Sequence, residues 1–239
     1  MPSLNPFKRQ KQESNPQHAN DWYSKGSNLS SLGYFDDAIK CYDQALKIYP
    51  EYLQALLGKG FCLGNLGRLE EEIKCYDNAI GIDPRYALAW NNKGFSLDNL
   101  GRLDEAIKCY DKALEIDPKY IHALNNKAKS LASLKRFDEA IKCCDEILKT
   151  DPRDTQTWSR KGVWLNMSSR VEEGMKCYDR ALEIDPKYIP AWTNKANSLG
   201  SLGHFQEAIE CCNKALEIDP KCESAMHLKA MAKNKLGYT

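Results

Sequence analysis

The sequence predicts an all-α protein built from a repeated pair of helices. The first observation is the spacing of its prolines, because six of them follow one another at intervals of 34 residues along the 239-residue chain. An unbroken period of that length is typical of stacked repeat proteins. The second observation is that no segment has the pattern of a β-strand. The six prolines are Pro50, Pro84, Pro118, Pro152, Pro186 and Pro220.

Other residue types recur with the same period. A tryptophan or leucine lies 28 residues before each proline, a small residue follows four positions later, and an alanine lies five residues before most of the prolines. Large and small residues at constant places indicate one packing arrangement that is used repeatedly. The first position holds Trp22, Leu56, Trp90, Leu124, Trp158 and Trp192, and the small position holds Gly26, Gly60, Gly94, Ala128, Gly162 and Ala196.

The first half of each repeat predicts one helix. In residues 87–120, Trp90, Gly94 and Leu97 have the spacing i, i+4, i+7, which places them on one helical face. Gly101 follows this stripe, and glycine tolerates the left-handed conformation that ends many helices. We therefore expect a helix of about four turns that ends near Gly101.

The second half predicts another helix. Ala106, Tyr110 and Ala113 form a second stripe with helical spacing, and acidic residues precede it, which suits a helix N-terminus. Pro118 ends this helix, because the residue before a proline is pushed out of the helical region. The small residues let the two helices approach while the aromatic residues fill the remaining space.

This framework resembles that of tetratricopeptide repeat (TPR) proteins, whose units are helix-turn-helix pairs of 34 residues. The resemblance implies a right-handed α-solenoid, or superhelix, of antiparallel helix pairs with one continuous core. Residues 1–18 stand outside the repeats and are expected to be a flexible, polar and basic leader. The six repeats are 19–52, 53–86, 87–120, 121–154, 155–188 and 189–222, followed by a capping helix and tail at 223–239.

The charge balance and hydropathy of the sequence argue against nucleic acid and membrane as partners. The 34 basic and 33 acidic residues give a net charge of +1, which implies no general attraction to nucleic acid. No apolar run is long enough to cross a membrane, and the first residues lack the apolar stretch of a signal peptide. We expect a cytoplasmic protein that binds neither nucleic acid nor membrane.

Ten cysteines are present, but six of them occupy one repeat position, at which a free thiol acts as a small apolar side chain. We expect no disulfide and no metal site, since no C-x-x-C occurs and the histidines have no ligand spacing to the cysteines. So many free thiols favour a reducing cytoplasm. The six are Cys41, Cys75, Cys109, Cys143, Cys177 and Cys211.

The chain contains no motif for phosphate binding, dinucleotide binding, zinc proteolysis or a serine nucleophile. We therefore predict neither enzymatic activity nor a cofactor, and binding remains as the function. In TPR proteins the first helices line a concave groove that receives a segment or helix of a partner. The resemblance places these residues in the groove: Leu57, Phe61, Asn65, Asn91, Asn92, Phe95, Asn99, Asn125, Asn126, Lys129, Asn194 and Asn197.

Within this groove, Asn92, Asn126 and Asn194 recur at one position and resemble a partial asparagine ladder for an extended peptide. The lysine clamp of TPR co-chaperones is missing, because its positions hold other residues. Lysine recurs instead just before the small residue, and these side chains are expected to pair with acids such as Asp117 or Asp151. They are Lys25, Lys59, Lys93, Lys127, Lys161, Lys195 and Lys229. The clamp positions hold Tyr23, Leu57, Asn91, Asn125, Ser159 and Thr193.

Two repeats depart from the pattern. In the fifth, Trp164 is expected to fill space left by Ser168 and Gly174, and in the second, Glu72 replaces an alanine for no reason visible in the sequence. The predicted function is a protein-interaction scaffold that binds a segment of a partner protein. Two alternatives stay open: an array that assembles end to end through its terminal helices, and a non-catalytic regulatory subunit of an enzyme complex.

Overall fold

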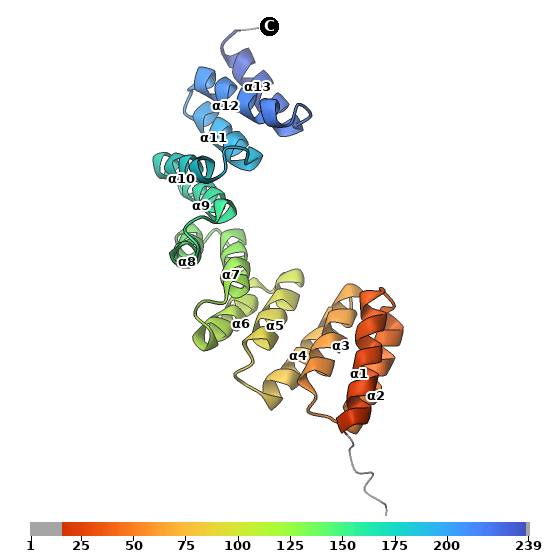
Figure 1. Ribbon diagram of the computed structural model, residues 1–239. Helices are drawn as coiled ribbons and strands as arrows, with labels where there is room; N and C mark the ends of the chain where they lie inside the picture. The colour runs from red at the N-terminus through yellow and green to blue at the C-terminus, as the bar shows by residue number, and fades with distance from the viewer. Residues whose placement is uncertain (1–15, 238–239) are drawn as a thin grey trace, which may run out of the picture. The chain divides into compact units, whose positions relative to one another are not determined.

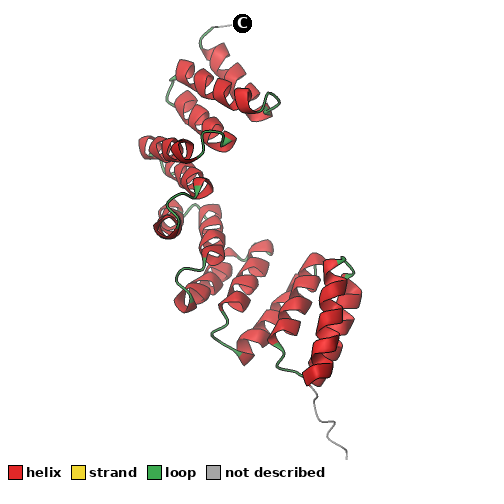
Figure 2. Ribbon diagram, viewed as in Figure 1, coloured by secondary structure: helices red, strands yellow, loops and turns green. Residues whose placement is uncertain are grey.

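The computed structural model describes residues 16–237, which form thirteen α-helices and no strand (Figures 1 and 2). The predicted all-α fold of helix pairs is confirmed. The helices are α1 (Pro16–Ser31), α2 (Phe35–Ile48), α3 (Leu53–Asn65), α4 (Leu69–Ile82), α5 (Ala87–Asn99), α6 (Leu103–Ile116), α7 (Ile121–Ser133), α8 (Phe137–Thr150), α9 (Thr155–Met167), α10 (Val171–Ile184), α11 (Ile189–Ser201), α12 (Phe205–Ile218) and α13 (Glu223–Lys235).

Each predicted repeat contains two consecutive helices, and α13 follows the sixth pair as the expected terminal helix. At the N-terminus, α1 begins at Pro16, so residues 16–18 of the predicted leader are helical. The rest of that leader, residues 1–15, lies outside the described residues, as do residues 238–239.

The helices form two compact units rather than the single continuous core that the repeat pattern implied. The first unit ends at Arg102 and the second begins at Leu103, so the boundary lies in the turn between the two helices of the third repeat. Each unit has its own buried clusters. One cluster of the first unit is centred on Tyr42 and Leu63, and one of the second unit on Leu131 and Leu165.

The end of each first helix is set by a residue in the left-handed conformation. Gly67 and Gly101 have φ angles of +73° and +74°, and the amide of Arg68 donates to the carbonyl of Leu63 at 2.9 Å, as in a Schellman motif. In the fourth and fifth repeats this position is held by Lys135 and Ser169, with φ angles of 60° and 63°. A side chain in this conformation is strained, because its Cβ approaches the carbonyl oxygen.

We expect Ser169→Gly to raise the free energy of unfolding by about 1 kcal/mol, because glycine adopts the left-handed conformation without that strain. Thermal unfolding followed by circular dichroism measures the gain. The control is Ser168→Gly, since Ser168 has an ordinary φ of −95° and its replacement should bring no gain. An equal gain from both variants would contradict the explanation.

The turn between repeats explains why aspartate, proline and tryptophan share one period. Asp83 accepts a hydrogen bond from the backbone amide of Arg85 at 2.9 Å, which stabilises the turn around Pro84. The indole Nε1 of Trp90 donates to the carbonyl of Pro84 at 3.0 Å. Trp158 and Trp192 make the same bond to the prolines six residues before them. The tryptophan thus anchors its helix to the preceding turn.

Within a repeat, the small residue of the first helix contacts the second helix directly. A Cβ atom on Gly60 would lie 2.7 Å from Cε1 of Tyr76, so the tyrosine ring occupies the space of the missing side chain. In the fourth repeat this glycine is replaced by Ala128 and the tyrosine by Cys144, and both are fully buried. A larger residue at the small position thus accompanies a smaller residue at the tyrosine position.

The cysteines are packing residues, as predicted. Nine of the ten are buried, all ten are free thiols, and Cys222 is partly exposed. Burial raises the pKa of Cys143 to about 11 and that of Cys144 to about 12. These thiols stay protonated near neutral pH, where a protonated thiol is a poor nucleophile.

The recurring lysines pair with acids other than those expected. In five of them, the ammonium lies 2.5–2.6 Å from an aspartate that precedes the lysine by sixteen residues, on the second helix of the preceding repeat. The prediction of Asp117 or Asp151 as the partners was wrong, because the direction of the helix places the ammonium beside the middle of the neighbouring helix. The pairs are Lys59–Asp43, Lys93–Asp77, Lys127–Asp111, Lys161–Asp145 and Lys195–Asp179.

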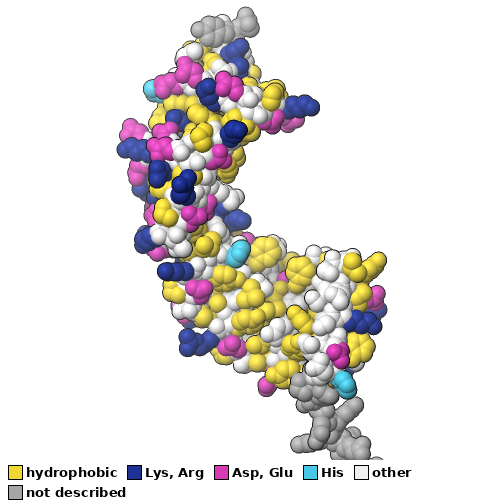
Figure 3. Space-filling view, viewed as in Figure 1, with side chains coloured by type: hydrophobic (Ala, Val, Ile, Leu, Met, Phe, Trp, Pro, Cys, Tyr) yellow, Lys and Arg dark blue, Asp and Glu magenta, His cyan; other side chains and the backbone are white. Residues whose placement is uncertain are grey.

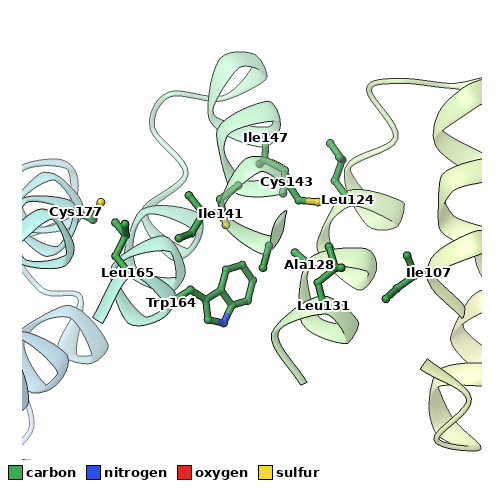
Figure 4. Close-up of a cluster of buried hydrophobic side chains, with 12 residues drawn as sticks. Ile107, Leu124, Ala128, Leu131, Ile141, Cys143, Ile147, Trp164, Leu165 and Cys177 are labelled. Carbon is green, nitrogen blue, oxygen red and sulfur yellow. The ribbon is translucent and has the colours of Figure 1, made fainter. Parts of the chain in front are cut away.

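The side-chain packing around Trp164 in the fifth repeat differs from the prediction. Trp164 is buried and belongs to a cluster that contains Leu131 of α7 and Ile141 of α8 (Figure 4). The space beside Gly174 is occupied instead by Asn166, whose side-chain oxygen would overlap with a Cβ at that glycine. Trp164 therefore packs against the fourth repeat, and Asn166 is the residue that compensates for Gly174.

Candidate functional site

The first unit contains a surface cavity of about 330 Å³ between α3, α4 and α5. Five of the predicted groove residues meet there, although they come from two different repeats. The sequence-based prediction missed four further residues of its wall. The cavity is lined by Phe61, Gly64, Asn65, Leu69, Glu72, Tyr76, Asn92, Phe95 and Asn99.

Two phenylalanines on neighbouring first helices form the apolar part of the cavity. Phe61 is 56 % exposed and Phe95 is 49 % exposed, which is unusual for residues of this size. On its other side, Phe61 packs edge-on against Phe35 of α2, with 6.3 Å between the ring centroids. Figure 3 shows hydrophobic side chains on the visible face of the first unit. Both rings are therefore accessible to a partner in the conformation that the structure shows.

Asparagine amides form the polar part of the wall. Asn65 donates from Nδ2 to the carbonyl of Phe61 at 2.9 Å, which holds it against its own helix. Oδ1 of Asn92 accepts a bond from Nδ2 of Asn91 at 3.2 Å, so one of its polar groups is used within the chain. Asn99 is exposed at the end of α5. The wall thus offers neutral donors and acceptors beside the two rings.

The floor of the cavity holds a buried carboxyl group. Glu72 is only 6 % exposed, and its Oε1 accepts a hydrogen bond from the hydroxyl of Tyr76 at 3.1 Å. Burial raises the pKa of Glu72, and hydrogen bonds from Ser96 and Tyr76 oppose that rise. Space for the side chain comes from Gly64, because a Cβ there would lie 2.7–2.9 Å from the carboxyl atoms. The structure thereby explains how Glu72 fits where the other repeats have alanine or glycine.

We expect Glu72→Gln to stabilise the protein at neutral pH but hardly at pH 4. The folded state holds the proton of Glu72 more tightly than the unfolded state, so stability is lost as pH rises from the ordinary pKa of 4.5 through the raised folded value. Glutamine has no such loss, and urea denaturation at both pH values measures the difference. Glu70→Gln, at an exposed site on the same helix, is the control. A gap between Glu72→Gln and the wild type that does not grow with pH would contradict the assignment.

The other predicted groove residues of the first unit do not line this cavity. Leu57 is partly buried on α3, and Asn91 is 6 % exposed on α5, where its Nδ2 is bonded to Asn92. Asn91 is therefore largely inaccessible to a partner. The missed residues Glu72 and Gly64 carried a signal in the sequence, since Glu72 departs from the repeat pattern at a buried position.

The predicted residues of the second unit lie on two separate helices. On α7, Asn125 accepts a hydrogen bond from Arg160, Asn126 is partly buried, and Lys129 is exposed. On α11, Asn194 donates to the hydroxyl of Ser159 at 3.4 Å. Asn197 is exposed beside a cavity of about 230 Å³ between α11, α12 and α13, which contains none of the other predicted residues.

The described part of the chain contains neither a grouped set of metal ligands nor a membrane-spanning helix. Within residues 16–237, no three or more His, Cys, Asp or Glu side chains are grouped so that they could hold a metal ion. None of the helices in this range has the length and apolar character needed to cross a membrane. The cavity at Glu72 remains the place where the predicted residues gather.

Family models of the tetratricopeptide repeat match residues 19–52, 53–86, 87–120, 122–154 and 189–222. A TPR repeat-containing protein of Methanocaldococcus jannaschii is 44 % identical over 36 residues, which are 15 % of this chain and 11 % of that protein. The match thus spans about a tenth of the relative's length.

Solved structures share the fold at low sequence identity. PilF of Pseudomonas aeruginosa has a TM-score of 0.69 and 15 % identity, with 90 % of this chain and 97 % of that chain covered. A crystal structure of MamA has a TM-score of 0.66 and 21 % identity over 72 % of this chain and 94 % of that one. YrrB, described as a TPR protein with an unusual peptide-binding site, has a TM-score of 0.65 and 21 % identity, with coverage of 79 % and 97 %.

Proposed function

Because the chain belongs to the tetratricopeptide repeat family, we propose that it is a protein-interaction scaffold that binds an extended segment of a partner protein. The binding site is the cavity of the first unit. The observation that carries the proposal is that Phe61, Asn65, Asn92, Phe95 and Asn99, which come from two repeats, line one cavity. We propose a binding role without catalysis.

The chemistry of this wall suits a peptide. Exposed aromatic rings on adjacent helices are unfavourable in water, and a partner side chain that covers them removes that cost. Side-chain amides both donate and accept hydrogen bonds, so they can match the alternating groups of a peptide backbone. The similarity to YrrB, whose description mentions a peptide-binding site, supports the same class of ligand.

Selection from a randomised peptide library tests the proposal. The full chain is immobilised, enriched peptides are labelled, and their affinity is measured by fluorescence polarisation. The double variant Phe61→Ser/Phe95→Ser should weaken binding by about tenfold or more, because aromatic anchors dominate binding energy at such sites. Leu32→Ser is the matched control, since Leu32 is 70 % exposed and lies outside the cavity. Recovery of no peptide, or equal binding by both variants, argues against this site.

End-to-end self-association is a second candidate, and one observation favours it. The terminal helix α13 exposes Met226 and Met231 to 44 % and 52 %, and Leu236, just after its last residue, is 38 % exposed. We expect light scattering to show a mass that grows with protein concentration and that Met231→Glu suppresses, because a buried charge opposes the contact. A constant monomeric mass at all concentrations would remove this candidate.

A further inference from the structure

We propose that the cavity of the first unit receives a basic side chain, an arginine or lysine, of the bound segment, with Glu72 as its counter-ion. This inference rests on the proposed binding function and specifies what the partner must present. It follows from three features of the cavity: the burial of Glu72, the neutrality of the other groups around it, and the aromatic walls above it.

The first feature is a buried acid that has no cation. Glu72 forms no ion pair with any of the described residues, and its hydrogen-bond partners Tyr76 and Ser96 are neutral. Burial of a carboxyl group without a counter-charge is costly, and a well-placed cation lowers that cost. The equivalent positions in the other repeats hold alanine or glycine, so packing of the repeat does not require an acid there.

The second feature is the position of the carboxyl group at the cavity wall, beside Gly64. A Cβ on Gly64 would lie 2.7 Å from Oε1 and 2.9 Å from Oε2 of Glu72, and both residues line the cavity. The carboxyl group therefore occupies the place of the side chain that Gly64 lacks, and there it borders the cavity. Oε1 already accepts a hydrogen bond from the hydroxyl of Tyr76. A carboxylate has several acceptor sites on its two oxygens, so it can accept further N–H groups of an ammonium or guanidinium beside Tyr76 and Ser96.

The third feature is the wall, which fits a long side chain with a charged end. The rings of Phe61 and Phe95 can pack against an alkyl stem and attract a cation through their faces. The amide oxygens of the asparagines can accept further N–H groups of that cation. The volume of about 330 Å³ is near the lower end of ligand sites, which span about 300–1,000 Å³. It suits one side chain rather than a large ligand.

The fifth repeat supplies a contrast at the equivalent place. There Asn166 takes the position of Gly64 and Gly174 that of Glu72, so a polar group again lies between the two helices. The Asn166 amide is neutral, and its Nδ2 donates to Tyr178 at 3.1 Å and also to Ser198. Its donors are used within the chain. The second repeat alone combines this placement with an acid.

Small blocked amino acids test the pocket in the full chain. The probes are N-acetyl-arginine methylamide, its lysine equivalent and N-acetyl-citrulline methylamide, which has nearly the shape of the arginine compound without its charge. NMR titration follows the side-chain amide signals of Asn65, Asn92 and Asn99. We expect the arginine or lysine compound to bind about tenfold or more tightly than the citrulline compound, and Glu72→Gln to remove that preference. Glu70→Gln, with the same change of net charge, should retain it.

Equal binding of the charged and citrulline compounds overturns the inference, as does a preference that survives Glu72→Gln. If that variant failed to fold, the comparison of probes on the unchanged chain would still decide. The outcome is distinct from that of the proposed function. Peptides that need Phe61 and Phe95 but carry no basic residue would sink the inference and leave the scaffold function standing. A library that yields no binder would reject the scaffold function, whatever the probes show.

Discussion

Replacement of Trp164 by alanine is expected to lower the free energy of unfolding by about 3–5 kcal/mol. Trp164 is 6 % exposed and packs in one cluster with residues of α7, α8 and α10. The guanidinium of Arg160 also lies 6.0 Å from the centre of its ring. Truncation would remove these contacts and leave a cavity between the fourth and fifth repeats. Urea denaturation measures the total loss, and hydrogen exchange in α7–α9 locates it.

The control for this prediction is Trp22→Ala. Trp22 is 37 % exposed on α1, so its truncation removes less buried surface and should cost clearly less. Equal losses in the two variants would show that Trp164 does not hold the fourth and fifth repeats together. An exposed role in binding would then become the better explanation for this tryptophan.

The second large effect is expected from Gly162→Ala, which should lower the free energy of unfolding by about 1–3 kcal/mol. A Cβ at Gly162 would lie 2.5 Å from Cε1 of Tyr178 and 2.9 Å from the carbonyl oxygen of Gly174. The tyrosine ring or the backbone of α10 must move to admit it. The better helix propensity of alanine, roughly 0.5–1 kcal/mol, offsets only part of this cost. The midpoint of urea denaturation measures the net change.

A double variant identifies the clash as the cause. Tyr178→Cys should be destabilising by itself, because it removes a buried ring. The double variant Gly162→Ala/Tyr178→Cys recreates the pair found at Ala128 and Cys144, so its loss should be smaller than the sum of the single losses. Gly81→Ala is the control, since nothing lies within 4 Å of a Cβ built there and no clash is expected. Strict additivity of the two single losses would contradict the pairing.

The Glu72 cavity illustrates how stability and binding can oppose each other. An ionised carboxyl group is unfavourable in the buried site of the free protein, as its raised pKa indicates. Binding-site residues commonly lower the stability of the free protein, because they have polar groups whose interactions are completed only by the ligand. The expected stabilisation by Glu72→Gln and the expected loss of preference for a basic side chain are therefore two consequences of one group.

Local patterns made much of the fold predictable. The period of the prolines located the turns between repeats, and in five of the six the Asp-Pro sequence forms the same hydrogen-bonded turn. Residues with helical spacing, such as Ala106, Tyr110 and Ala113, are buried as expected. These features depend on neighbours within one repeat, so one sequence was sufficient to derive them.

The candidate site was predictable only in part. Phe61 and Phe95 could be placed on one face, because their positions are equivalent in adjacent repeats. The burial of Asn91 could not, since it depends on contacts that residues distant in sequence create. The role of Glu72 needed the structure as well, because Gly64 provides its space from the facing helix.

The helices, their ends and the small or large residue at each packing position follow from the sequence alone. They do so because backbone conformation and helix pairing within a repeat are governed by residues that are near in the chain. The three-dimensional arrangement was needed to find where one compact unit ends and which aspartate pairs with a given lysine, as Asp43 does with Lys59. It also shows that an acid lies beneath two exposed rings. The physical reason is that burial and ion pairing depend on distances between repeats, which no periodicity specifies.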